Sequence, residues 1–172
     1  MRLSSPAVPV NVILLPSAGE IDRSQLLIAM AEQQIRVIDI DLPSAHPAPF
    51  ATRVCAAIQA AHPPSPVVVV ATPISAPHLP AIALAQRRAF RRVTGYALLE
   101  PGLIGGGDVP SGADWPDAPV ACLSIQATEP GWVRLRGWHG LSVGSLSTAA
   151  RVLAGWQEGS SFPGPDAIDQ FG

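Results

Sequence analysis

The sequence predicts a single α/β domain whose core is a doubly wound, mostly parallel sheet of about six strands. Short apolar runs rich in β-branched residues alternate with segments whose apolar residues recur at helical spacing, which is typical of βαβ units. The chain has 172 residues, a usual size for one domain, and 48% of them are apolar while 14% are charged. We expect the domain to span residues 1–157, with residues 158–172 forming a flexible tail.

The first two predicted strands enclose one predicted helix. Residues 11–15 and 36–40 are short apolar runs. Between them, Asp22 has a side chain suited to capping a helix, and Leu27 and Met30 lie at helical spacing in a segment that extends to about residue 33. A strand, a helix and a second strand in this order predict one parallel crossover unit.

The same order repeats up to residue 99. A proline-rich loop, Pro43–Pro49, leads into a helix that begins near Phe50. The next strand, Val67–Ala71, is the most apolar run in the chain, so we expect it at the centre of the sheet with both faces covered. A helix over residues 76–88 and a strand over residues 93–99 complete the regular part of the pattern.

The pattern is less regular in the last third of the chain. Residues 101–118 are rich in Gly and Pro and have no helical period, which predicts a long loop, either ordered or mobile, in place of a crossover helix. Residues 119–125 and 132–136 are predicted strands, and the short connection between them favours an antiparallel hairpin. Residues 143–156 show helical spacing and predict a last helix.

Composition excludes several classes of function. The net charge is −2 with no long run of one sign, and no apolar stretch is long enough to span a bilayer, so we expect neither nucleic acid nor membrane as a partner. All basic residues apart from histidine are arginines, and the absence of lysine excludes a P-loop and Schiff-base chemistry. Cys55 and Cys122 have the spacing of buried apolar residues, and His46, His62 and His78 lack metal-ligand spacing. We therefore expect a cytoplasmic protein without metal or cofactor.

Four segments, in order, resemble those of the α/β-hydrolase superfamily in a short form that lacks a lid and the first antiparallel strands. Val12–Gly19 resembles the strand and oxyanion loop near the start of that fold. Val37–Pro43 resembles the next strand and its turn, and Val67–Ser75 occupies the place of the strand and the nucleophile elbow. Trp138–Gly140 resembles the segment that bears the family's histidine. The resemblance implies a hydrolase-like fold with its site at the carboxyl ends of the strands.

The segment at the elbow lacks the family's nucleophile. Pro73 stands where the resemblance places the serine, and Ala71 and Ser75 stand where it places the flanking glycines. Proline has no hydroxyl group, and its fixed φ does not suit the strained elbow. Thr72 and Ser75 carry the nearest hydroxyls. Ser75 is therefore either a displaced nucleophile or a cap of the following helix.

The resemblance also implies a base and an acid. His139 takes the place of the base. If the predicted strand 132–136 is antiparallel to its neighbour, His139 emerges at the opposite end of the sheet from the elbow; if the fifth strand ends early and the chain returns extended, His139 lies beside the elbow. Glu100, at the carboxyl end of the fourth strand, is a candidate acid, and Glu129 holds the commoner acid position. Ser17 and Asp41 also end strands at this edge.

Two functions follow from these residues. The first is an enzyme that acts on an acyl ester or thioester, or by non-covalent acid–base chemistry, with His139, Glu100 and Ser75 in catalytic roles and a small-molecule substrate at the edge. The second is a noncatalytic pseudoenzyme that binds a ligand, a protein partner or a second copy of itself. The residues expected to contact the ligand are Ser17, Asp41, Thr72 and Pro73, and the side chains expected to anchor a protein partner are Trp115, Trp132 and Trp138.

Overall fold

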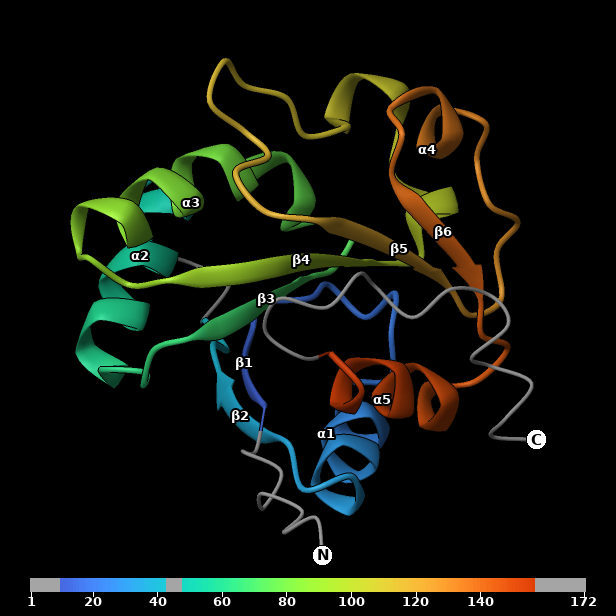
Figure 1. Cartoon of the computed structure of the whole chain (residues 1–172), viewed down its shortest axis with the longest axis horizontal. Helices are drawn as coiled ribbons and strands as arrows, with labels where there is room; N and C mark the ends of the chain where they lie inside the picture. Colours follow the sequence, from blue (N-terminus) through green and yellow to red (C-terminus); the bar gives the residue numbers. More distant parts are fainter. Residues whose placement is uncertain (1–9, 43–47, 157–172) are drawn as a thin grey trace, which may run out of the picture.

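A computed structural model describes residues 10–42 and 48–156, and the fold is α/β with a six-stranded, entirely parallel sheet (Figure 1). The predicted tail 158–172 and most of the predicted loop 43–49 lie outside the described residues. The strands follow the order β2-β1-β3-β4-β5-β6 across the sheet. Their bounds are β1 (Asn11–Leu14), β2 (Arg36–Asp39), β3 (Val67–Ala71), β4 (Val93–Leu99), β5 (Val120–Ser124) and β6 (His139–Ser142).

Helices cover both faces of the sheet. One face carries α1 and α5, and the other carries α2, α3 and α4 (Figure 1). In the described part of the chain, no helix is long and apolar enough to cross a bilayer. The bounds are α1 (Arg23–Glu32), α2 (Phe50–Ala61), α3 (Leu79–Arg88), α4 (Trp132–Leu135) and α5 (Leu146–Ala154), with short 3₁₀ turns η1 (Ala76–His78), η2 (Pro101–Leu103) and η3 (Gly106–Asp108).

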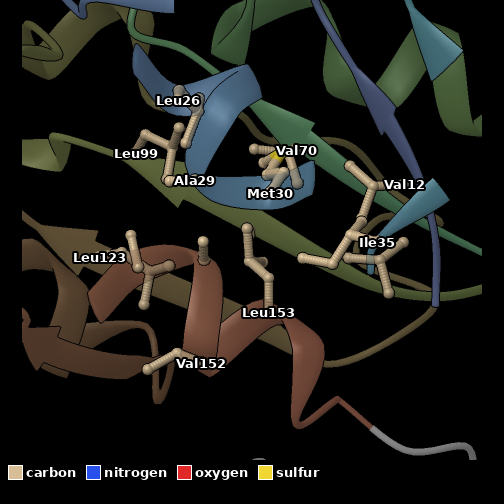
Figure 2. Packing of buried hydrophobic residues seen from close by; sticks show 14 of the residues in the cluster. Val12, Leu26, Ala29, Met30, Ile35, Val70, Leu99, Leu123, Val152 and Leu153 are labelled. Atoms are coloured by element: carbon tan, nitrogen blue, oxygen red, sulfur yellow. The ribbon is translucent and has the colours of Figure 1, made fainter. Parts of the chain in front are cut away.

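The central position predicted for Val67–Ala71 is confirmed, because β3 lies between β1 and β4 and all of its residues are buried. Alternate residues of β3 point to opposite faces: Val70 joins the cluster under α1 and α5, and Val69 joins the cluster under α2 and α3. Figure 2 shows Met30 of α1 and Leu153 of α5 in the first cluster with Val70. Full burial of a Val or Leu side chain contributes roughly 1.5–3 kcal/mol to the free energy of unfolding. Because β3 supplies buried side chains to both clusters, it helps to hold both helical layers on the sheet.

The predicted strand over residues 132–136 is wrong, and so is the antiparallel hairpin. Residues 132–135 form the short helix α4, in which the N–H of Val133 donates to the Pro130 carbonyl at 3.1 Å. Gly137 then adopts a φ of +68°, and β6 begins at His139. Residues 125–138 are long enough for a crossover of about a dozen residues, and β6 therefore pairs parallel to β5.

The predicted loop over residues 101–118 is ordered. Trp115 is buried in it and its ring meets that of Tyr96 edge-to-face at 5.4 Å. The Tyr96 hydroxyl donates to Asp117 Oδ1 at 2.6 Å, and the Arg87 guanidinium donates to Asp117 Oδ2 at 2.8 Å. These contacts connect the loop to β4 and α3, so side-chain packing takes the place of a crossover helix.

Candidate functional site

Because all six strands run in the same direction, their carboxyl ends lie together at one end of the sheet, which we call the carboxyl edge. Side chains hold the loops that follow the strands in place there. The Thr72 hydroxyl donates to the Pro16 carbonyl at 2.6 Å, which joins the loop after β3 to the loop after β1. Of the predicted site residues, all but His139 lie in loops at this edge: Ser17, Asp41, Thr72, Pro73, Ser75 and Glu100.

Ser75 is fully buried in the turn that follows β3. Its Oγ accepts the Thr72 N–H at 2.8 Å and lies 3.1 Å from the Thr72 hydroxyl and 3.2 Å from the Thr72 carbonyl oxygen. The side chain makes no capping hydrogen bond to η1. Ser75 therefore closes the turn, a third role beside the two that the sequence suggested. What the turn presents to solvent is Ile74, which is 46% exposed, and half-buried Pro73.

Glu100 is 5% exposed and adopts a left-handed backbone conformation with φ +49°. Its carboxylate accepts three backbone N–H groups: Oε1 accepts those of Ile125 and of Gln126, the latter at 2.9 Å, and Oε2 accepts that of Ala127 at 3.1 Å. A non-glycine residue in this region costs about 1–3 kcal/mol and persists only where its surroundings hold it there. The three hydrogen bonds supply that constraint, so the carboxylate organises the loop after β5.

His139 lies on β6, the last strand of the sheet, away from Ser75. It is the first residue of β6 and pairs with Ala121, whereas Ser142 at the end of β6 pairs with Ser124. Through β5 and β4, this register places His139 level with Val70, near the carboxyl end of β3. However, β3 is three strand spacings of about 4.8 Å away from β6. The imidazole of His139 is consequently too far from Ser75 to take its proton.

In the loop after β1, which resembles an oxyanion loop, side chains of this chain form hydrogen bonds with the loop. The N–H of Ala18 donates to Glu20 Oε2 at 2.6 Å, so a carboxylate of the chain occupies one donor of this loop. Half-buried Ser17 accepts from the guanidinium of Arg23 at 3.4 Å. An incoming oxyanion would have to displace Glu20 to reach the Ala18 N–H.

Arg23, which the sequence did not single out, joins the ends of β1 and β2. Its guanidinium donates to the carbonyls of Leu15 at 2.9 Å and Ile40 at 3.2 Å, and it forms an ion pair with Asp39. Asp41 follows Ile40 and is exposed. The only sequence signal for Arg23 is its place directly after the predicted cap Asp22.

His78 is a second residue that sequence reasoning set aside. It lies in η1, directly after the turn that follows β3, and its ring packs at a tilt on that of Phe50 with centroids 4.6 Å apart. Burial lowers the pKa of the His78 imidazole, and the negative charge of Asp108 opposes this shift. Among the described histidines, His62 ends α2 and His139 begins β6, so His78 is the imidazole at the carboxyl edge.

In the described part of the chain, neither cysteine is suited to act as a nucleophile, and no metal-binding cluster is found. Cys122 is fully buried in β5, and burial, with the charge of Glu129, raises the pKa of its thiol to about 12. Burial also raises the pKa of half-buried Cys55. Both thiols are therefore protonated at neutral pH and unsuited to nucleophilic attack. Within residues 10–42 and 48–156, no group of three or more His, Cys, Asp or Glu side chains gathers to hold a metal ion.

The chain matches no protein-family model and no curated protein. The functional argument therefore rests on the geometry of the carboxyl edge. There, the hydroxyl and carboxylate groups expected to carry out chemistry are Ser75, Thr72 and Glu100, and each makes hydrogen bonds within the fold.

Proposed function

We propose that this protein is a noncatalytic pseudoenzyme related to the α/β-hydrolases, which binds a ligand or a protein partner. The strand β3, the turn 72–75 and the helices η1 and α3 supply the strand–turn–helix context in which that family carries its nucleophile. Pro73 stands in the turn, where a hydroxyl would be needed. Cys55 and Cys122 form no disulfide, which fits the cytoplasmic location that we propose.

One observation carries this proposal: the candidate nucleophile and the candidate base are both placed where they cannot react. The hydroxyl of Ser75 is fully buried and hydrogen-bonded to Thr72. His139 stands on β6, three strands away from β3 and the turn that holds Ser75. A serine nucleophile needs a base within about 3.2 Å of its oxygen, and this requirement is not met by Ser75 and His139.

Labelling with a fluorophosphonate probe tests the proposal. We expect the purified full chain to give no adduct after mass mapping, because an unactivated, buried hydroxyl does not attack phosphorus. A serine hydrolase mixed into the same sample controls for probe activity, and the Ser75→Ala variant is the matched control for background. An adduct on Ser75 in the parent chain, absent from the variant, would overturn the noncatalytic proposal.

A second function, non-covalent acid–base chemistry on an acyl ester or thioester, is favoured by one feature, the position of His78. Its imidazole lies at the carboxyl edge and its lowered pKa keeps it neutral, as a base requires. If this function is real, turnover of p-nitrophenyl acetate should fall in His78→Gln and persist in His139→Gln. Equal, background rates in the parent chain and both variants would exclude it.

A further inference from the structure

The outer edge of β6 has backbone groups that no strand in the described part of the chain pairs with. β6 ends the strand order, with β5 as its neighbour (Figure 1). The N–H of Val143 donates to the Ser124 carbonyl at 2.9 Å, so this residue faces β5. Because backbone direction alternates along a strand, the N–H and C=O groups of Gly140 and Ser142 point outward. Both residues are exposed.

The surface beside this edge combines cations with apolar side chains. In α4, which packs against β6, Leu135 is 89% exposed and the Arg134 side chain is 86% exposed. Arg136, also exposed, holds its guanidinium over the ring of half-buried Trp138 at 5.2 Å. Trp138 in turn meets Trp132 edge-to-face at 5.9 Å. The exposed Leu lies beside two half-buried Trp rings and exposed Arg side chains, which are residue types that protein interfaces favour.

The charges beside the edge decide what kind of partner fits. Glu129 accepts from Arg134 at 3.3 Å but is only 21% exposed, which leaves the more exposed charges of α4 positive. A second copy paired antiparallel at β6 would bring both α4 helices to the same face of the joined sheet, where Arg134 and Arg136 of each copy would repel. One carboxylate, that of Glu129, lies beside Gly140. Because Arg134 and Arg136 outnumber it, an acidic segment is attracted to this surface on balance.

We propose that the free edge of β6, together with α4, binds an extended acidic segment of a partner protein by adding it to the sheet as a further strand. Backbone hydrogen bonds to Gly140 and Ser142 would supply pairing, as in other cases of strand addition. Arg134 and Arg136 would select acidic side chains, and Leu135 would contact apolar ones. This inference rests on the partner-binding part of the proposed function and names the partner's chemistry.

Selection of peptides from a random dodecamer display library, with the immobilised full chain as bait, tests the inference. Enriched peptides should carry net negative charge and alternate acidic with β-branched residues. Their binding should slow hydrogen exchange at the backbone amides of Gly140 and Ser142. The double variant Arg134→Glu, Arg136→Glu should weaken binding by about tenfold or more. The matched control is Arg36→Glu on β2, the other outer strand, which should bind as the parent chain does.

A second variant tests strand addition separately from charge. Ser142→Pro removes one outward N–H but leaves the inward-facing residues Leu141 and Val143 free to pair with β5, so the fold is retained while the docked strand loses a hydrogen bond. Selected peptides should therefore bind this variant at least several-fold more weakly. The inference is overturned if no peptides are enriched, if bound peptides leave the exchange of residues 139–142 unchanged, or if both variants bind as the parent does. A fluorophosphonate adduct would refute the noncatalytic proposal alone, so the two failures are distinguishable.

Discussion

Replacing Gly95 with alanine tests how closely Trp156 packs on the sheet. Gly95 lies in β4, and a Cβ atom added there would stand 1.8 Å from Cζ2 of the Trp156 ring. Trp156 follows α5 and is 6% exposed within the cluster under α1 and α5. Since the clash involves a large buried ring, the indole must move before the methyl group fits.

The expected cost follows from two limits. If the ring shifts within the core, overpacking costs about 1–3 kcal/mol in the free energy of unfolding. If the ring is expelled, the loss approaches the roughly 3–5 kcal/mol of a Trp-to-Ala substitution in a core. Gly95→Ala is therefore expected to destabilise the protein by about 1–5 kcal/mol, although alanine is otherwise the better residue in a strand.

A double-mutant cycle with Trp156→Ala measures the clash itself. Urea unfolding, followed by circular dichroism, gives the free energy of unfolding of the parent chain, both single variants and the double variant. With the indole removed, Gly95→Ala should be close to neutral, so the coupling energy should be at least about 1 kcal/mol. An equal cost of Gly95→Ala in both backgrounds would refute the close contact between Gly95 and Trp156.

Four further predictions concern three polar residues, Glu100, His78 and Tyr96. Glu100→Gln should lower the free energy of unfolding by about 1–3 kcal/mol, because an amide cannot accept all three backbone N–H groups that the carboxylate accepts; urea midpoints equal to those of the parent would contradict this role. Because burial lowers the pKa of His78 in the folded protein, the unfolded chain binds more protons than the folded chain as the pH falls. The stability that neutral His78 contributes is therefore fully present above the unfolded pKa and is lost as the pH falls below it. The parent should thus lose more melting temperature between pH 8 and pH 5.5 than His78→Gln does, and parallel losses would exclude the effect. Burial and the hydrogen bond to Asp117 raise the pKa of Tyr96, so its absorbance should not change on titration to pH values at which free tyrosine ionises. Tyr96→Phe should cost about 1–3 kcal/mol by leaving an Asp117 oxygen without its donor, and unchanged thermal stability would argue against that bond.

Local sequence was sufficient where a short segment carries its own signal. Val67–Ala71 has no polar residue, and such a strand is stable only between two covering layers, where the structure places it. Asp22 could also be predicted as a helix cap from local sequence, because Asp is favoured at that position. In the structure its side chain accepts the N–H of Gln25 at 3.0 Å.

Residues 132–136 show where local sequence fails. Apolar and charged side chains alternate over residues 133–136, which fits a half-buried strand. A single helical turn serves equally well by burying Val133 and exposing Leu135. Five residues are too few to separate a period of two from a period of 3.6. Packing of Val133 into the cluster under α2 and α3 favours the helix, and that contact involves residues far away in the chain.

The candidate site depended on tertiary structure more than the strands did. The sequence identifies Ser75, Glu100 and His139 as residue types able to do chemistry, but the environment of each is made by distant segments. Glu100 meets three N–H groups of the loop after β5, and His139 begins β6, which the strand order places three strands away from β3. The order of the strands in the sheet thus decided which side chains meet, since side chains three strand spacings apart cannot reach each other.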